Sequence, residues 1–404
     1  MCDCVIVNRA YRTELDPNNR QQTLLSRSAG TARFAWNWGL QKRIEEYRAT
    51  GRSSNAIAQH RQLNGYKKAF FPWMYQVSKC CPQEALRDLD RAYKNFFEGR
   101  AGFPRFKSKK RGAGSFRLTG AIRVCQDRIQ LPRLGKIGLK EKGYIPTDAH
   151  MLSATVSERA GRWFVSVAVE EEIQVPENDG PMVGVDLGVT RMATVSDGTV
   201  FENPKALKRH ERRLKRLQRS VSRKQKGSIN RAKARLGLAR VHLKIADIRR
   251  DAVHKATSWL ARTKSAIVVE DLNVQGIHKN HHIARSVGDA GMGEFRRQLE
   301  YKTLWYGSRL IVADRFYPST KICSVCGHAQ NIPLSERTHR CSVCRLEIDR
   351  DLNAALNLEK VAASSTETIN ACLRREVHAS PTVEVQVPAH DAGIEHHLGE
   401  VLDG

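Results

Sequence analysis

Strand-type patterns enclose a helical pattern in the first 178 residues of the chain. A short apolar run at Cys4-Val5-Ile6-Val7 precedes a turn at Asp16-Pro17-Asn18. From about 20 to 98, apolar residues recur three and four positions apart, which is the spacing of one helix face. Between 115 and 175 short β-type runs return, ending with the alternating segment 163–169. The pattern therefore predicts a small β domain with a helical insertion.

A turn-rich segment at 175–181 separates this region from a second one, in which strands and helices alternate. The elements predicted there are a strand pair over 183–195, a long helical region over about 205–262, a strand at 267–269, a helix over 295–306, a strand at 310–312 and a helix over 352–361. Alternation of this kind predicts an α/β domain. The whole chain is therefore expected to combine α/β and α+β domains.

Charge is strongly positive and unevenly distributed. The 404 residues carry 68 Lys and Arg against 42 Asp and Glu, a net charge of +26. Between 205 and 250 there are 18 basic residues and two acids, too few acids to pair the basic side chains along a helix. This imbalance predicts a surface that faces nucleic-acid phosphates. The segment after residue 362 is acidic instead, and we predict a disordered tail there.

Membrane insertion and secretion are not expected. The chain has no run of 18 apolar residues and no signal pattern at its start. Its ten cysteines show no regular disulfide framework, which favours a reducing, cytoplasmic compartment.

Four of the cysteines have the spacing of a zinc ribbon. Cys323 and Cys326 form one Cys-x-x-Cys pair, Cys341 and Cys344 form a second, and 14 residues separate the pairs. Each pair can turn two thiolates toward one tetrahedral Zn²⁺. Because four sulfurs close the coordination sphere, this zinc is expected to be structural. The other six cysteines are expected to be buried or incidental thiols, namely Cys2, Cys4, Cys80, Cys81, Cys125 and Cys372.

Three acids stand at positions where separate elements could converge. Asp186 ends one apolar run, Glu270 ends a second, and Asp351 begins the last predicted helix. Strand ends can present side chains from distant positions at one point, and a helix start favours a carboxylate. Three such carboxylates would repel one another unless a cation joined them. Oxygen ligands suit Mg²⁺ or Mn²⁺, and two such ions can hydrolyse a phosphodiester.

Spacing alone leaves alternatives open for these acids. Asp351 could be a helix N-cap and Asp186 a turn residue. Asp349 and Asp271 are rival ligands close by in the sequence.

Motifs of several kinds occur in one order up to about residue 362. They are Phe34-Ala35-Trp36-Asn37-Trp38, Gly102-Phe103-Pro104-Arg105-Phe106-Lys107, Gly184-Val185-Asp186-Leu187-Gly188, Val269-Glu270-Asp271-Leu272, Leu299-Glu300-Tyr301-Lys302, Pro318-Ser319-Thr320-Lys321, both cysteine pairs and Asp349-Arg350-Asp351-Leu352-Asn353-Ala354-Ala355. In these motifs the chain resembles the TnpB family, the RNA-guided nucleases of prokaryotic insertion sequences and compact relatives of type V CRISPR effectors. In the second cysteine pair Arg345 stands where relatives usually have Gly, which leaves the turn geometry there open.

The resemblance implies a fold and a catalytic site. The implied domains are a wedge β-barrel over 1–15 and 113–178, a helical recognition segment over 16–112, a RuvC-type (RNase H-like) nuclease domain over 182–362 with a zinc ribbon inserted at 316–348, and the tail 363–404. The family's catalytic acids, which would hold Mg²⁺ or Mn²⁺, match Asp186, Glu270 and Asp351. Asp351 is preferred to Asp349 because it is the acid followed by x-Asn-Ala.

The resemblance also implies partners: a guide RNA from the transposon end, and double-stranded DNA with a short motif beside the target. A monomeric, nucleoid-associated ribonucleoprotein is expected. Lys79 and Gln83 are candidates for contact with that motif or, equally, for a solvated helix face. The basic loop is expected to hold RNA phosphates through Arg105, Lys107, Lys109 and Lys110, and Trp36 and Trp38 are expected in the core rather than stacked on bases. The alternative function is a guided DNA-binding regulator or transposition accessory protein without cleavage.

Overall fold

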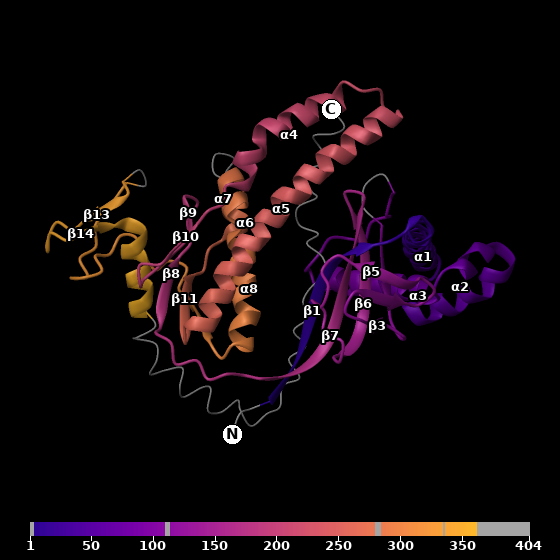
Figure 1. Ribbon diagram of the computed structural model, residues 1–404, viewed down its shortest axis with the longest axis horizontal. Helices are drawn as coiled ribbons and strands as arrows, with labels where there is room; N and C mark the ends of the chain where they lie inside the picture. The colour runs from indigo at the N-terminus through magenta and orange to yellow at the C-terminus, as the bar shows by residue number, and fades with distance from the viewer. Residues whose placement is uncertain (1–3, 110–113, 279–283, 334–335, 362–404) are drawn as a thin grey trace. The chain divides into compact units, whose positions relative to one another are not determined.

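The structure is a computed structural model that describes residues 4–109, 114–278, 284–333 and 336–361. The chain divides into two compact units, one over Ile6–Glu172 and one that begins at Ile173. Figure 1 shows the elements of both. The tail predicted after residue 362 lies outside the described residues. None of the described helices is long and apolar enough to cross a membrane.

The first unit contains a seven-stranded sheet in the order β2-β6-β7-β1-β5-β4-β3. Its strands are β1 (Cys4–Asp16), β2 (Ser115–Leu118), β3 (Arg123–Val124), β4 (Arg128–Leu131), β5 (Gly135–Leu139), β6 (His150–Arg159) and β7 (Arg162–Gln174). The apolar run 4–7 predicts a short first strand, whereas β1 continues beyond it to Asp16. The strand order has two ends, β2 and β3, so the closed barrel stays a prediction.

Three α-helices and a short 3₁₀ turn fill the gap between β1 and β2, as the helical pattern predicts. They are α1 (Asn19–Thr50), α2 (Ala56–Phe70), η1 (Pro72–Gln76) and α3 (Cys80–Phe97). The α1 helix begins at a capping box of Asn18 and Gln21 and ends at Gly51, whose φ of 68° suits glycine. Trp36 is buried, as expected, and Trp38 packs half-buried against the core.

The second unit is built on a five-stranded sheet in the order β10-β9-β8-β11-β12. Its strands are β8 (Val183–Asp186), β9 (Arg191–Val195), β10 (Val200–Glu202), β11 (Ala266–Glu270) and β12 (Arg309–Ala313). The β8, β11 and β12 strands are parallel, whereas β9 is antiparallel to β8 and to β10. The β11 strand lies between two parallel neighbours, which explains its continuous apolar sequence.

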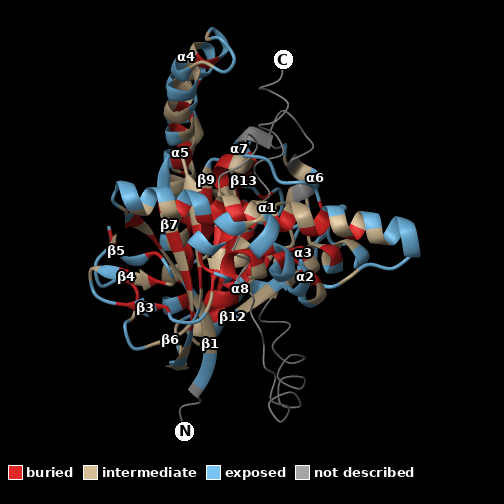
Figure 2. Ribbon diagram, turned by 90° about the vertical axis from the view of Figure 1, so that its right-hand side faces the viewer, coloured by how far each residue is buried: buried red, intermediate tan, exposed pale blue. Residues whose placement is uncertain are grey.

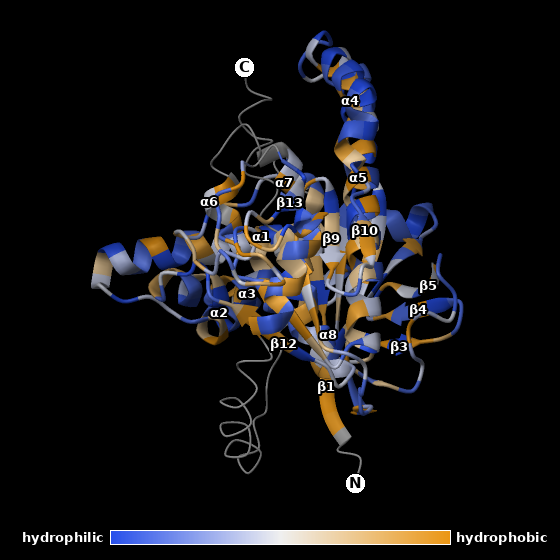
Figure 3. Ribbon diagram, turned by 90° about the vertical axis from the view of Figure 1, so that its left-hand side faces the viewer, coloured by the Kyte–Doolittle hydropathy of each residue, from blue (hydrophilic) through white to orange (hydrophobic). Residues whose placement is uncertain are grey.

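The long helical region predicted over 205–262 is a pair of helices, α4 (Ala206–Ser222) and α5 (Ile229–Thr263). The break follows from Gly227, whose φ is 87°, and from Ser228, whose hydroxyl accepts from the backbone N–H of Arg231 and caps α5. This α4–α5 hairpin has a small apolar core of its own. Its outer surface is largely exposed (Figure 2) and hydrophilic (Figure 3). The remaining helices are α6 (Val274–His278), α7 (Ala284–Ala290), α8 (Met292–Trp305) and a helix over 350–361.

Successive side chains of a strand point to opposite faces of the sheet, and helices cover both faces of this one. In β8 and β11 the odd-numbered residues pack against α5 and α8, as Val185 and Val269 do. The even-numbered ones face the 350–361 helix, where Val268 packs against Leu358. At Gly184 the contact is close: a Cβ there would lie 2.0 Å from the carbonyl oxygen of Ala355. Only glycine lets the helix approach the strand this closely.

We predict that Gly184→Ala lowers the free energy of unfolding by about 1–3 kcal/mol, because its Cβ would meet backbone atoms that cannot rotate away. Gly65→Ala is the matched control: this glycine lies within α2, and nothing lies within 4 Å of an added Cβ. The control should raise stability by up to about 1 kcal/mol through helix propensity. Urea unfolding of both variants measures the difference. Equal stability of Gly184→Ala and the parent would contradict the close contact.

Candidate active site and zinc site

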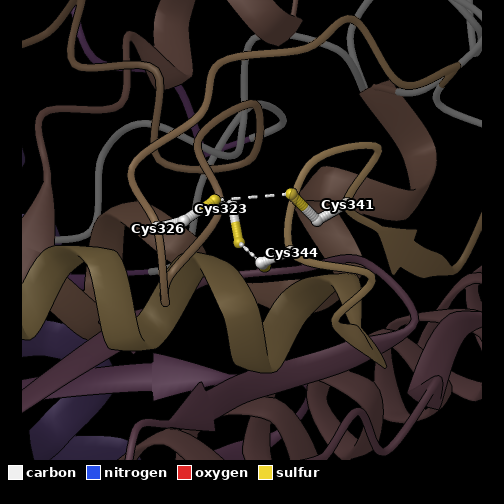
Figure 4. A group of neighbouring side chains, drawn as sticks. All are labelled: Cys323, Cys326, Cys341 and Cys344. Carbon is white, nitrogen blue, oxygen red and sulfur yellow. Dashed lines mark hydrogen bonds between the residues drawn. The ribbon is translucent and has the colours of Figure 1, made fainter.

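The four cysteines of the ribbon form a cluster that fits zinc. The Sγ atoms of Cys323, Cys326, Cys341 and Cys344 all lie within 4.8 Å of one another. Figure 4 shows how the four side chains lie. Two of the Sγ–Sγ distances, Cys323 to Cys344 and Cys326 to Cys341, are 3.5 Å. A tetrahedral zinc with Zn–S bonds of about 2.3 Å requires sulfurs about 3.8 Å apart, close to these values. The backbone amides of Cys344 and Val343 hold the pKa of Cys341 below its usual range, which favours the thiolate that zinc binds.

The two cysteine turns have the same backbone geometry, which answers the question left open at Arg345. In each turn the residue four positions after the first cysteine donates its N–H to that cysteine's carbonyl: Gly327 to Cys323 at 3.0 Å and Arg345 to Cys341 at 3.1 Å. Both residues have positive φ, 73° for Gly327 and 59° for Arg345. Arg345 therefore adopts the left-handed conformation that glycine adopts more easily. A short antiparallel pair, β13 (Thr338–Arg340) and β14 (Glu347–Asp349), completes the ribbon.

Asp186 and Glu270 lie at the carboxyl ends of two neighbouring parallel strands. Val185 of β8 pairs with Val269 of β11, so the next residue of each strand is one of the two acids. Both acids have even numbers, and the even-numbered side of these strands faces the 350–361 helix. Asp186 is buried, with 9% of its surface exposed.

The 350–361 helix brings the third acid to the same place. Its Ala355 carbonyl lies at Gly184, and Asp351 lies one turn earlier, about 6 Å along the helix axis. Two residues of strand from Gly184 to Asp186 span about 6.6 Å. These lengths agree, and the charge of Asp351 acts on Asp186, so Asp351 lies near Asp186. Burial and the charges of Glu270 and Asp351 raise the pKa of Asp186 to about 8, while Arg350 opposes this shift.

The rival acids have other partners. Asp349 caps the helix: its Oδ1 accepts from the backbone N–H of Asp351 at 3.0 Å and of Leu352 at 3.2 Å. The capping role considered for Asp351 thus belongs to Asp349. The other oxygen of Asp349 accepts from Arg191 at 2.9 Å. Asp271 accepts from two guanidinium groups, those of Arg296 and Arg315.

Ser319 contacts the candidate site, although the sequence alone does not predict a role for it. Its hydroxyl donates to Glu270 Oε1, and the serine is almost fully buried. The sequence signal was present, because Ser319 belongs to the motif Pro318-Ser319-Thr320-Lys321.

Two arginines approach the third acid: Arg337 and Arg350 lie 3.9 and 3.7 Å from Asp351 Oδ1. Among the described residues, the four cysteines are the only group of three or more His, Cys, Asp or Glu side chains whose ligand atoms all lie within 4.8 Å of one another.

The ribbon is fastened to the helix that carries Asp351. Asn353 donates to the carbonyl of Ile322 at 2.7 Å and accepts from the N–H of Ser324 at 2.9 Å. One turn later, Asn357 donates to the carbonyls of Ser319 and Ile322 at 2.8 and 2.6 Å. Both asparagines are fully buried. The first cysteine turn and the helix therefore form one hydrogen-bonded body.

The predicted nucleic-acid residues lie in the first unit, at two places. Lys79 is exposed just before α3, and Gln83 is half-buried in the helix's first turn. The basic loop is held on α1: Trp36 Nε1 donates to the carbonyl of Arg105 at 2.9 Å, and Asn37 exchanges two hydrogen bonds with the backbone of Lys107.

Two motifs of the sequence thus meet at this loop. The Lys107 ammonium lies 3.7 Å from the centre of the Trp36 ring. Arg105 and Lys109 are exposed, and Lys110 lies outside the described residues. The phosphate contacts of these residues stay predictions.

Comparison with known proteins identifies the family. Family profiles match residues 164–281 ("Probable transposase"), 293–358 ("Cas12f1-like, TNB domain") and 1–52 ("Helix-turn-helix domain"). A protein from Streptomyces pristinaespiralis named "Putative RNA-guided DNA endonuclease" is 38% identical over 357 residues, which are 87% of this chain and 89% of the relative. The chain belongs to the TnpB family.

Other relatives of the TnpB family agree. A protein of Escherichia coli (strain K12), "Putative RNA-guided DNA endonuclease InsQ", is 36% identical over 371 residues, 87% of this chain and 91% of the relative. The fold resembles that of the protein in the cryo-EM structure of a Cas12f1–sgRNA–target DNA complex, with a TM-score of 0.52 at 12% identity over 88% of this chain and 99% of that one.

We predict that Cys341→Ser loses most of the zinc, from about one ion per chain, and unfolds at a lower temperature, because structural zinc binding contributes directly to folding. Cys125→Ser, which removes an exposed thiol outside the cluster, should change neither property. Zinc analysis by mass spectrometry and thermal unfolding measure both. Full zinc content and stability in Cys341→Ser would exclude the ribbon assignment.

Proposed function

We propose that the chain is an RNA-guided DNA endonuclease that hydrolyses phosphodiester bonds in a single RuvC-type (RNase H-like) site. One observation carries the proposal: β8, β11 and the 350–361 helix bring Asp186, Glu270 and Asp351 to one face of the sheet. The names of the relatives and the membership of the TnpB family support the same activity. The strand order, with a parallel β8-β11-β12 set beside an antiparallel pair, agrees with the proposed nuclease fold.

The donor set fits a hard divalent cation. Asp186 is buried, and the two neighbouring acids disfavour its charged form, so a cation among the three would relieve the repulsion. Carboxylate oxygens are the ligands that Mg²⁺ and Mn²⁺ prefer. Asp186, Glu270 and Asp351 would hold the metal, which when bound activates a water and stabilises the leaving 3′ oxygen.

Other residues of the chain position these ligands. The Ser319 hydroxyl donates to one oxygen of Glu270 and so orients that carboxylate. Asp349 caps the helix, so the side chain of Asp351 on the first turn is not needed for capping. Asn353 and Asn357 hold the helix against the ribbon. In this proposal these contacts hold the three carboxylates before a metal binds, which would limit the reorganisation that binding requires.

The proposed partners are a guide RNA and double-stranded DNA. Guide pairing would supply sequence specificity, and the protein would hold backbones and read a short motif next to the target. Lys79 and Gln83 are the candidates for motif contact, and Arg105, Lys107, Lys109 and Lys110 for RNA phosphates. The α4–α5 hairpin, with its excess of basic residues and exposed surface, is suited to a phosphate backbone.

The test is reconstitution. The protein is expressed together with the DNA that flanks its gene, bound RNA is sequenced, and a guide-matched plasmid library with randomised flanks is offered in Mg²⁺. Depletion of plasmids with one flanking motif is the expected result. Bound RNA without depletion would favour a guided binding regulator, and absence of bound RNA would favour a transposition accessory protein.

We predict that Asp186→Asn abolishes this cleavage while guided DNA binding stays within about threefold of the parent, since the substitution removes a metal ligand and no nucleic-acid contact. Glu270→Gln should do the same. Gel-shift and plasmid-cleavage assays separate the two properties. Normal cleavage by either variant in Mg²⁺ would refute the assignment of the acids.

The same substitution should stabilise the metal-free protein. Asp186 has a pKa of about 8 in the folded chain against 3.8 ordinarily, so above pH 4 the folded state retains a proton that the unfolded state has lost. Stability of the parent therefore falls as pH rises from 4 toward 8, and Asp186→Asn removes this loss. Thermal unfolding in Mg²⁺-free buffer without chelator, which leaves zinc in place, should show the variant's advantage growing with pH. Parallel pH profiles for parent and variant would contradict the buried acid cluster.

A further inference from the structure

A strip of aromatic rings follows the surface of the helical segment in the first unit. It runs over α1, α2 and η1, and Figure 1 labels the two helices. The rings of this aromatic strip are, in order of contact, Trp38, Tyr66, Phe70, Phe71, Phe34 and Trp73. Neighbouring ring centres lie 4.8 to 6.4 Å apart. Six rings in continuous contact form one surface rather than scattered exposed residues.

The fold does not need the outer half of this strip. Phe34, Trp38 and Phe71 pack against the core of the unit. Tyr66, Phe70 and Trp73 are exposed by 42%, 68% and 39% instead. Neighbouring rings of the strip meet edge to face or tilted, at interplanar angles of 53° to 82°, so they do not stack on one another. An exposed apolar surface of this kind marks an interaction site.

The charge around the strip indicates a polyanionic partner. Between residues 17 and 80 there are 11 Lys and Arg against two acids, Glu45 and Glu46. Arg27 is exposed seven residues before Phe34, on the same face of α1, and it donates to Gln76 at the end of η1. Of the large apolar residues exposed in this segment, only Ile57 is aliphatic. Aromatic rings are common in protein interfaces as well, so the excess of cations is what favours nucleic acid: rings among cations are the composition of surfaces that bind unpaired nucleotides.

We propose that the aromatic strip stacks unpaired bases of single-stranded nucleic acid, with Arg27 beside the phosphates. The strip leads within six residues from Trp73 to Lys79, the proposed contact to the target-adjacent motif. In that respect the proposal rests on the proposed function: the duplex opens beside the motif, and the strip would receive the strand that becomes unpaired there. Stacking is tolerant of sequence, because every base has a π-face.

The test compares binding by the full-length, zinc-loaded protein, free of RNA, in Mg²⁺-free buffer. The probes are a fluorescent oligothymidylate, an abasic oligodeoxynucleotide of equal length and an oligouridylate, followed by anisotropy. Phe70→Ala should weaken base-bearing probes about five- to 100-fold, the range of aromatic stacking, and leave the abasic probe unchanged. Tyr47→Ala is the matched control, since Tyr47 is 64% exposed on α1 and lies outside the strip. The oligothymidylate should bind at least as tightly as the oligouridylate, because the proposed strand is DNA; tighter binding of the oligouridylate would overturn that assignment.

A second readout separates stacking from charge. The salt dependence of binding should keep its slope in Phe70→Ala and become shallower in Arg27→Gln, because of these two residues only the arginine is placed beside phosphate. Equal effects of Phe70→Ala and Tyr47→Ala, or equal affinity for abasic and base-bearing probes, would overturn the proposal. So would a dimer in sedimentation that Phe70→Ala dissociates without loss of oligonucleotide binding. Guided cleavage is assayed separately, so that a failure of the strip and a failure of the nuclease assignment are distinguishable.

Discussion

The close packing of the 350–361 helix on β8 is the contact on which the candidate site depends. A strand and a helix approach this closely only where the strand has no side chain, and Gly184 provides that position. The contact also sets the positions of two acids. The helix from Ala355 to Asp351 and the strand from Gly184 to Asp186 cover nearly the same distance. A larger residue at 184 would lift the helix and move Asp351 away from Asp186. The glycine thus serves the site although it contacts neither metal nor substrate.

The same helix is held on its other side by the ribbon. Asn353 and Asn357 lie one turn apart, and both bond backbone groups around Ile322, next to the first cysteine turn. Backbone geometry in that turn depends on the thiolates and on the zinc that fits between them. The zinc site is therefore linked by hydrogen bonds to the position of Asp351. The candidate zinc site and the proposed catalytic carboxylate thus share one hydrogen-bonded support.

Much of this organisation was visible in the sequence, and what was missed has physical reasons. Strands that end in an acid are recognisable because a buried parallel strand is continuously apolar, so Asp186 and Glu270 stand out. The break between α4 and α5 was missed because charged helices continue their pattern across a short turn, and the cap at Ser228 is a weak signal. The roles of Ser319 and the two asparagines could not be predicted, since each depends on a partner more than 25 residues away. Spacing also could not decide between Asp349 and Asp351.

The arginines near the site form hydrogen bonds with the two acids that are not proposed as metal ligands. Asp349 and Asp271 lie within one or two residues of the proposed ligands, yet each is paired with arginine. A carboxylate paired in this way keeps its charge without a metal ion. Asp186 is in the opposite situation, because burial and two neighbouring acids raise its pKa. A buried carboxylate beside like charges opposes folding. A cation bound among the carboxylates would turn this repulsion into attraction and stabilise the folded state. Asp351 lies between these two cases, because Arg337 and Arg350 approach its Oδ1 only to 3.9 and 3.7 Å, farther than the 2.9 Å from Arg191 to Asp349.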